Sequence, residues 1–213
     1  MIEFLIGSSL AASAGLNAWM PLFLLGLADR FLPAVALPPG WSWISSDIAL
    51  WVLGILLVLE IVADKVPALD SINDVVQSVL RPAAGGIVFG AGSSSQTVAV
   101  DDPGSFFSEN TWVPIVTGIV IALIVHVVKA GTRVAANTVT GGVAAPVLST
   151  AEDGASFLLA TLAIVIPVLA GVLLLALIIA VVLLFRRRSR RKRERDISRS
   201  SPANDSDAAT PLR

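Results

Sequence analysis

The chain has 213 residues, of which 55% are hydrophobic, and a formal net charge of −1. Its mean hydropathy of +0.82 is that of an integral membrane protein rather than of a soluble domain with a single core. The absence of cysteine excludes disulfides, thiolate metal sites and a cysteine nucleophile, and the single histidine, His126, excludes a multi-histidine metal site. We therefore expect neither a metal nor another cofactor.

The first apolar segment extends from about Phe4 to Ala28 and is interrupted by several polar residues. Ala12-Ser13-Ala14 resembles a signal-peptide cleavage site, but the Met-Ile-Glu start lacks the positive charge of such a peptide. We therefore expect this segment to be retained in the membrane. The proline-rich stretch after it carries Trp41 and Trp43, which is typical of a loop at the membrane interface.

Residues 48–63 form a second apolar segment, interrupted only by Glu60. From Pro67 to Arg81, apolar residues recur at helical spacing with acidic and amide residues between them. This stretch is too polar to span a membrane, so we expect a short amphipathic helix lying at the interface. Residues 82–100 form a weak third segment, rich in small residues, which either spans the membrane or re-enters it.

The fourth segment, Trp112–Val128, is strongly apolar, whereas residues 134–149 form a weak fifth segment that spans or re-enters. The sixth segment, Phe157–Phe185, contains no charged side chain. It is longer than the roughly 20 residues that cross a bilayer core, with Pro167 and Gly171 as the expected kink. The fold class is therefore an all-α integral membrane protein with about six hydrophobic segments.

Residues 1–185 are predicted to form the transmembrane domain and residues 186–213 a disordered tail, since the tail has no apolar periodicity. Ten of the fifteen Lys and Arg residues lie in this tail. Clustered basic residues stay in the cytoplasm. Six crossings of the cytoplasmic membrane then place both termini inside. Four full crossings with two partial ones remain the alternative.

The basic tail is expected to bind anionic lipid head groups, because each charge near such a surface is worth about 1 kcal/mol. Nucleic acid is not expected as a partner, since the tail lacks a folded platform and interleaved aromatic residues. Homo-oligomerisation stays open. The tail residues assigned to lipid contact are Arg186, Arg187, Arg188, Arg190, Arg191, Lys192 and Arg193.

Two groups of ionisable residues are predicted at similar depth near the inner ends of the second and fourth segments. Glu60 and Asp64 lie one helical turn apart, and His126, Lys129 and Arg133 follow a similar spacing. Ionisable residues within a membrane are costly and mark functional sites by default. One hypothesis is a proton or ion relay in which Glu60 exchanges a proton beside His126 or Lys129. The other is a structural ion pair, with Lys129 extending to the interface.

Two places combine an asparagine with helix-breaking residues: Asn17 with Pro21, and Asn137 with Gly141 and Gly142. Broken helices are tolerated in a membrane where the freed backbone groups are buried in protein or line a cavity. These residues therefore indicate a cavity for a solute or ion. The alternative is close helix packing, which small residues also permit.

Three stretches, AGLNAWMPLFLLGLADRF, VLEIVADKVPALDSINDVVQSVLRPAAGG and HVVKAGTRVAANT, together resemble a bacterial membrane family known as domain of unknown function 4126. The similarity covers about Ser13 to Asp153, and ADKVPALD followed by RPAAG is its most specific part. The family usually has a Ser-Pro-Glu-Pro-like stretch after the position of Asn137, where this chain has Thr-Val-Thr-Gly-Gly. The resemblance implies a membrane protein without an established activity.

Two functions from different classes fit the sequence. The first is a small solute, ion or lipid transporter or channel built around the broken segments. The second is a non-transporting scaffold whose basic tail binds anionic lipid or protein partners. The sequence contains no catalytic triad pattern, phosphate-binding loop, dinucleotide fingerprint or zinc-ligand spacing, so we favour a protein that is not an enzyme.

Overall fold

The computed structural model describes all residues except 98–111, 180–181, 184–185 and 187–213, and leaves out the side chains of 67–72 and 74. Met1–Leu174 form one compact unit and Leu175–Arg213 another. Regular structure in the described residues is helical, apart from one isolated bridge between Ala36 and Gln96. The elements are α1 (Ile2–Leu16), α2 (Met20–Phe31), the short 3-10 helix η1 (Ser42–Ser45), α3 (Asp47–Ala63), α4 (Pro67–Ser93), α5 (Trp112–Thr140) and α6 (Ala145–Val165).

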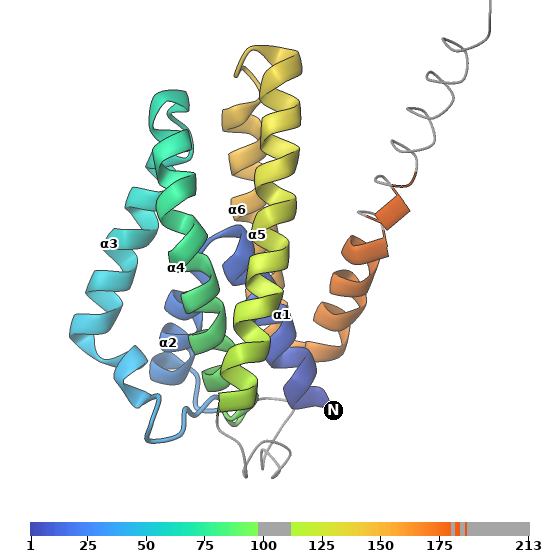
Figure 1. The fold of residues 1–213 in the computed structure, drawn as a ribbon. Helices are drawn as coiled ribbons and strands as arrows, with labels where there is room; N and C mark the ends of the chain where they lie inside the picture. The colour runs from blue at the N-terminus through green and yellow to red at the C-terminus, as the bar shows by residue number, and fades with distance from the viewer. Residues whose placement is uncertain (98–111, 180–181, 184–185, 187–213) are drawn as a thin grey trace, which may run out of the picture. The chain divides into compact units, whose positions relative to one another are not determined.

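Helices α1 and α2 form a hairpin rather than the single segment expected for residues 4–28. Helix α1 starts at the end of the unit that carries η1, and α2 returns towards that end (Figure 1). With 15 and 12 residues, the two helices are about 22 and 18 Å long, shorter than a bilayer core of ~30 Å. The hairpin therefore reaches only part of the way along the bundle.

This hairpin changes the expected position of the N-terminus. Six crossings place Met1 and the 32–46 loop on opposite sides of the membrane, whereas the structure places both at the same end of the unit (Figure 1). The reason is the break at residues 17–19, which reverses the chain halfway. The polar residues that interrupt the segment mark a turn, not merely a weak span.

Helix α4 joins two stretches that the sequence analysis treats separately. The expected interfacial helix, residues 67–81, and the weak third segment, residues 82–100, are wrong as separate elements, because α4 continues through Pro82 to Ser93. Packing compensates for the backbone hydrogen bond that Pro82 removes, because Ala84, Val88 and Phe89 after it are buried in the core. The polar first half and the small-residue second half thus belong to one helix about 40 Å long.

Helices α5 and α6 are long and apolar enough to cross a membrane, with 29 and 21 residues. Residues 134–149, expected as a separate weak segment, are instead the end of α5, a turn and the start of α6. The turn requires glycine, since Gly141 and Gly142 have φ values of 61° and 90°.

The expected sixth segment is likewise divided. Helix α6 ends at Val165, and another apolar helix covers Pro167–Ile179. Ile166 between them has φ −137° and ψ 71°, outside the helical region. A residue before proline is restricted in this way, so Pro167 ends one helix and starts the next instead of kinking a single one.

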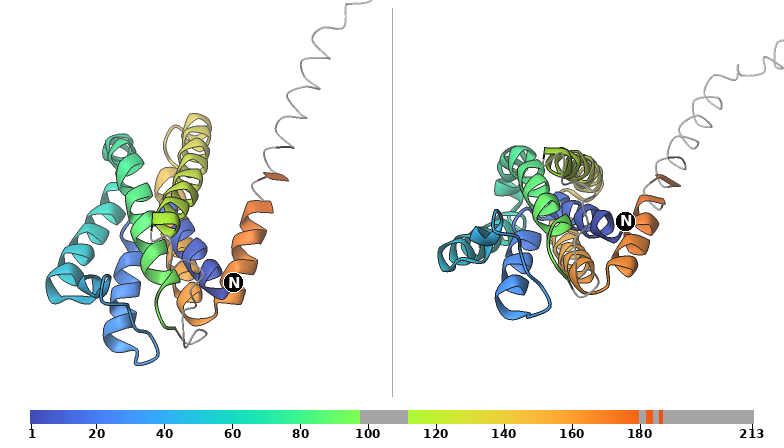
Figure 2. Two further views of the ribbon diagram at one scale, coloured as in Figure 1. Left: turned by 60° about the horizontal axis from the view of Figure 1, so that its bottom comes forward. Right: turned by 90° about the horizontal axis from the view of Figure 1, so that it is seen from below.

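Helix α1 lies among α4, α5 and α6 (Figure 2), where small residues allow the backbones to approach. A Cβ atom on Gly15 would lie 2.7 Å from the carbonyl oxygen of Ala122, and one on Gly85 would lie 2.8 Å from that of Gly118. Such contacts are too short for any side chain, so glycine is required at these crossings.

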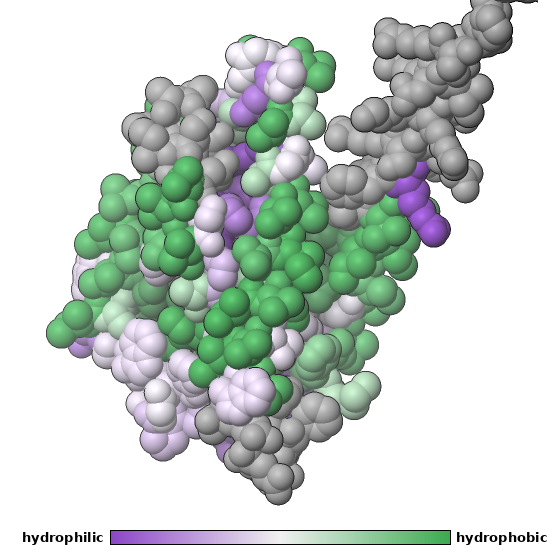
Figure 3. Space-filling view, in the orientation of Figure 1, coloured by the Kyte–Doolittle hydropathy of each residue, from purple (hydrophilic) through white to green (hydrophobic). Residues whose placement is uncertain are grey.

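Hydrophobic side chains cover much of the outer surface of α4 and α5 (Figure 3). Helix α3 also exposes a row of apolar residues, including Trp51, Ile55 and Val58. A soluble protein rarely exposes so large an apolar area. The described helices thus fit an uncharacterised membrane protein.

Candidate functional site: a buried charge network at the helix break

The break between α1 and α2 is built around Asn17, which is fully buried. Its side-chain oxygen accepts hydrogen bonds from the backbone N–H groups of Trp19 (3.2 Å) and Met20 (3.0 Å). Asparagine favours such local bonds over helix, and Pro21 fits the first turn of a helix. Asn17 therefore ends α1 and caps the start of α2.

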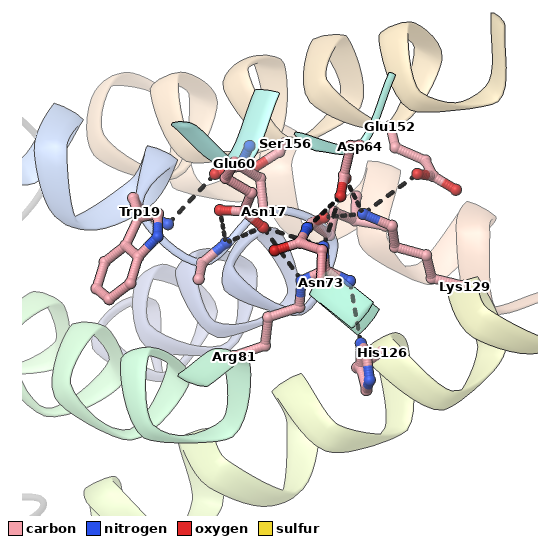
Figure 4. A network of polar contacts seen from close by, with 12 residues as sticks. Asn17, Trp19, Glu60, Asp64, Asn73, Arg81, His126, Lys129, Glu152 and Ser156 are labelled. Carbon is pink, nitrogen blue, oxygen red and sulfur yellow. Dashed lines mark hydrogen bonds and ion pairs between the residues drawn. The ribbon is translucent and has the colours of Figure 1, made fainter. Parts of the chain in front are cut away.

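Glu60 of α3 lies against this break and is 3% exposed. Its two carboxylate oxygens accept hydrogen bonds from the backbone N–H of Ala18, at 3.0 and 3.2 Å. Arg81 of α4 donates to the same carboxylate from Nη2 (3.0 Å) and Nε (3.3 Å). The carboxylate thus faces the positive end of α2 and a buried guanidinium together (Figure 4).

The C-terminal end of α1 is bonded to a positively charged side chain. Lys129 of α5, which is 3% exposed, donates from Nζ to the carbonyl oxygen of Leu16 at 2.6 Å. The last carbonyls of a helix carry partial negative charge, which a cation stabilises. The freed backbone groups on both sides of the break are therefore bonded to buried side chains of opposite charge.

Asp64, just after α3, is the centre of the network. It forms ion pairs with Lys129 (3.1 Å), Arg133 (3.2 Å) and Arg81 (3.5 Å), and Asn73 donates to it at 2.6 Å. One carboxylate thus connects α3 to both α4 and α5. The side chains of these ion pairs are at most 2% exposed, so water screens the pairs little.

Helix α6 adds two carboxylates at the less buried edge of the network. Glu152 pairs with Arg133 (2.8 Å) and with Lys129 (3.2 Å). Asp153 accepts from Asn17 (3.0 Å) and pairs with Lys65 (3.2 Å), whose side chain is 36% exposed. Polar contacts therefore run continuously from a surface lysine to the buried helix break.

His126 lies on the other side of Arg81. Its Nδ1 is 3.0 Å from Nη1 of Arg81, and its Nε2 is 3.1 Å from the hydroxyl of Ser78. A guanidinium can only donate, so Nδ1 accepts and the ring proton of a neutral His126 lies on Nε2. This contact therefore requires an unprotonated Nδ1.

The five ionisable residues singled out in the sequence, Glu60, Asp64, His126, Lys129 and Arg133, meet in this one network. Their pairing differs from the expected one. Glu60 bonds to Arg81 rather than to Lys129 or His126, and Lys129 bonds to Asp64.

Sequence reasoning missed Arg81, Lys65, Asn73, Glu152 and Asp153 as members of the network. Arg81 ends the expected interfacial helix, and the two acids follow the expected fifth segment, so neither position indicates a buried site. The signal that could have found Arg81 is its position in the RPAAG stretch, the most specific part of the family resemblance.

The second expected break, at Asn137 and the two glycines after it, lies outside the charge network. Asn137 lies in the last turn of α5 and Gly141 and Gly142 in the turn after it. Within the described part of the chain, the buried Oδ1 of Asn137 has no hydrogen-bond partner. Of the tail residues expected to contact lipid, only Arg186 lies within the described residues, where it is exposed.

The network offers carboxylates and an imidazole, which can exchange protons, and guanidiniums and an ammonium, which can hold anionic groups. In the described residues, no three His, Cys, Asp or Glu side chains are grouped so as to hold a metal ion. Two apolar pockets lie beside α2, and neither is lined by a residue of the network.

Residues 4–187 match the family model described as a domain of unknown function, DUF4126. No curated protein and no solved structure matches the chain. The match covers the broken hairpin, the charge network and all the helices around them. The chain therefore belongs to the family of domain of unknown function 4126.

Proposed function

We propose that this chain is a multi-pass protein of the cytoplasmic membrane, and that its buried charge network is the proton or ion relay of a small transporter or channel. The observation that carries this proposal is the Glu60 carboxylate, held between the backbone N–H of Ala18 at the helix break and the guanidinium of Arg81. The relay connects the half-length hairpin to α3, α4, α5 and α6.

The depth of the network supports a functional role. His126 comes 14 residues after the start of α5, about 21 Å along a helix of about 44 Å. Charges at this depth are costly, and replacing buried ion pairs by apolar residues of similar volume is often neutral or stabilising. Packing alone therefore does not require so many buried charges.

The hairpin is the element that a relay could move. It is held at its tip by bonds to Glu60, Lys129 and Asp153, all of which are charge-assisted. Protonating Glu60 removes the negative charge that attracts both Ala18 N–H and Arg81. Proton binding then loosens the hairpin tip, and the tip's release gives protons or ions access to the break.

A second candidate function is a non-transporting membrane scaffold. The close packing of Gly15, Gly85 and Gly118 favours it, since this packing leaves little space beside the hairpin. In that case the charge network fixes the positions of the helices, and the basic tail contacts anionic lipids or proteins.

Proton flux in proteoliposomes separates the two functions. The purified chain is reconstituted with a pH-sensitive dye inside, and flux is driven by a potassium diffusion potential. We expect flux above that of empty vesicles, its loss in Glu60→Gln, and its retention in Glu3→Gln, which removes a carboxylate outside the network. If the unaltered chain is folded in the vesicles and carries no more protons than empty ones, the relay is ruled out and the scaffold is favoured.

A further inference from the structure

A groove of about 730 Å³ lies between α2 and α3, apart from the charge network. Its walls are apolar and aromatic, with Phe23 and Leu27 from α2 and Leu50, Leu57 and Val58 from α3. Pockets that hold ligands are typically about 300–1,000 Å³. The groove therefore has the size and the lining of a binding site for an apolar molecule.

The groove exists because α3 is attached to the bundle near its two ends. At its start, η1 wedges between α2 and α3, where the carbonyl of Ile44 closely approaches Gly26. At its far end, Glu60 and Asp64 tie α3 to α4 and α5. Between these anchors, Gly54 leaves space opposite the ring of Phe23, since it has no side chain to fill it.

One end of the groove is polar. Arg30 and Asp47 line it and form an ion pair at 2.6 Å, with side chains 39% and 78% exposed. Arg30 also donates to the carbonyl oxygen of Ser45 at 3.2 Å. Trp51, which is 75% exposed, lines the same part of the groove, as tryptophan does at a membrane interface.

We propose that this groove binds one zwitterionic phospholipid, with an acyl chain along α3 and the headgroup at the Arg30–Asp47 pair. A guanidinium binds phosphate through paired hydrogen bonds, and a carboxylate binds an ammonium group. A headgroup that carries both charges satisfies both side chains. An anionic lipid lacking the ammonium would leave Asp47 facing a phosphate.

The length of the groove fits a single leaflet. Its lining on α3 extends from Asp47 to Leu59, a rise of about 18 Å along the helix, slightly more than half of a ~30 Å bilayer core. An acyl chain of one leaflet therefore extends along the groove while its headgroup stays level with Trp51. This site needs the chain to be in a membrane but does not need the relay.

The test is lipid retention on the full chain. The protein is purified in mild detergent, mixed with phosphatidylethanolamine or phosphatidylglycerol, and bound lipid is counted by native mass spectrometry. We expect one phosphatidylethanolamine per chain and about tenfold weaker retention of phosphatidylglycerol, as the loss of one charge-assisted bond predicts. Equal retention of the two lipids, or none of either, overturns the proposal.

Two variants locate the lipid. Gly54→Leu fills the groove and should abolish retention, whereas Gly131→Leu is the matched control, because a Cβ on Gly131 meets no atom within 4 Å. Arg30→Gln should lower phosphatidylethanolamine retention about tenfold. Unchanged retention in Gly54→Leu contradicts the site. Lipid retention is read in detergent and proton flux in vesicles, so failure of the relay and failure of this site are distinguishable.

Discussion

Glu60 and Arg81 form a buried, oppositely charged pair at the helix break, with side chains 1% and 0% exposed. The sequence places Glu60 within an apolar segment, and this alone predicts an ionisable site. The sequence could not identify the partner of Glu60, because that partner depends on how α4 packs against α3. Small residues after Arg81 let α4 come close to α5 and α1, and this contact buries Arg81.

The Glu60→Gln variant tests the pairing through stability. Removing the carboxylate charge takes from Arg81 one of its acidic partners, another being Asp64 at 3.5 Å. Breaking a buried ion pair typically costs about 3 to 5 kcal/mol. We expect a lower midpoint of thermal unfolding in detergent. Adding Arg81→Met should restore much of the loss, since no buried charge is then stranded at the break.

Lys129→Met is the control for this cycle, because Lys129 bonds to Asp64 and Leu16 rather than to Glu60. Combined with Glu60→Gln, it should recover less of the loss than Arg81→Met does, because residues of one network couple most strongly where they are in contact. Stronger recovery with Lys129→Met than with Arg81→Met would show that the pairing described here is incorrect.

At the scale of the elements, the apolar pattern locates α3 and the first part of α5 well, because each coincides with one apolar run. It fails where a helix breaks or continues against the local pattern. Asn17 marks a reversal of the chain, and Ile166 ends a helix within an unbroken apolar run. Conversely, α4 continues through Pro82. Packing against neighbouring helices decides these cases, and a single sequence does not contain that information.

The crossing of α4 and α5 gives a prediction at this scale. Gly85→Leu forces a side chain into the space occupied by Ala122 and Gly118, so the helices must separate. Overpacking of this kind costs about 1–3 kcal/mol. We expect a lower unfolding midpoint for Gly85→Leu and an unchanged one for Gly131→Leu, which faces open space. Equal stability of the two variants would contradict the close packing.

At the scale of the whole molecule, the part-length hairpin determines which end of the first unit carries the N-terminus. From the basic residues in the tail, we predict that residues 186 onward are cytoplasmic. Counting apolar segments predicts that Met1 is cytoplasmic too, but a hairpin that enters and leaves on one side does not count as a crossing. The N-terminus is then expected on the same side as the tryptophan-rich loop.

Single cysteines can test this orientation directly, since the chain has none of its own. We expect Glu3→Cys and Gly40→Cys to react with a membrane-impermeant maleimide from the outside of intact cells. Val139→Cys, at the opposite end of the bundle, should react only after the membrane is opened. Labelling of Glu3→Cys only after the membrane is opened, as expected for Val139→Cys, would mean that Met1 is cytoplasmic and that the hairpin does not enter and leave on one side.

The central claim is that the buried charge network carries protons or ions and does not merely hold helices together. Proton flux through vesicles containing the Glu60→Gln, Arg81→Met double variant tests it most directly. This variant is expected to fold with nearly the stability of the unaltered chain, yet it has lost the group that exchanges a proton. We predict no flux above that of empty vesicles. Flux equal to that of the unaltered chain, in a double variant of restored stability, would contradict the claim.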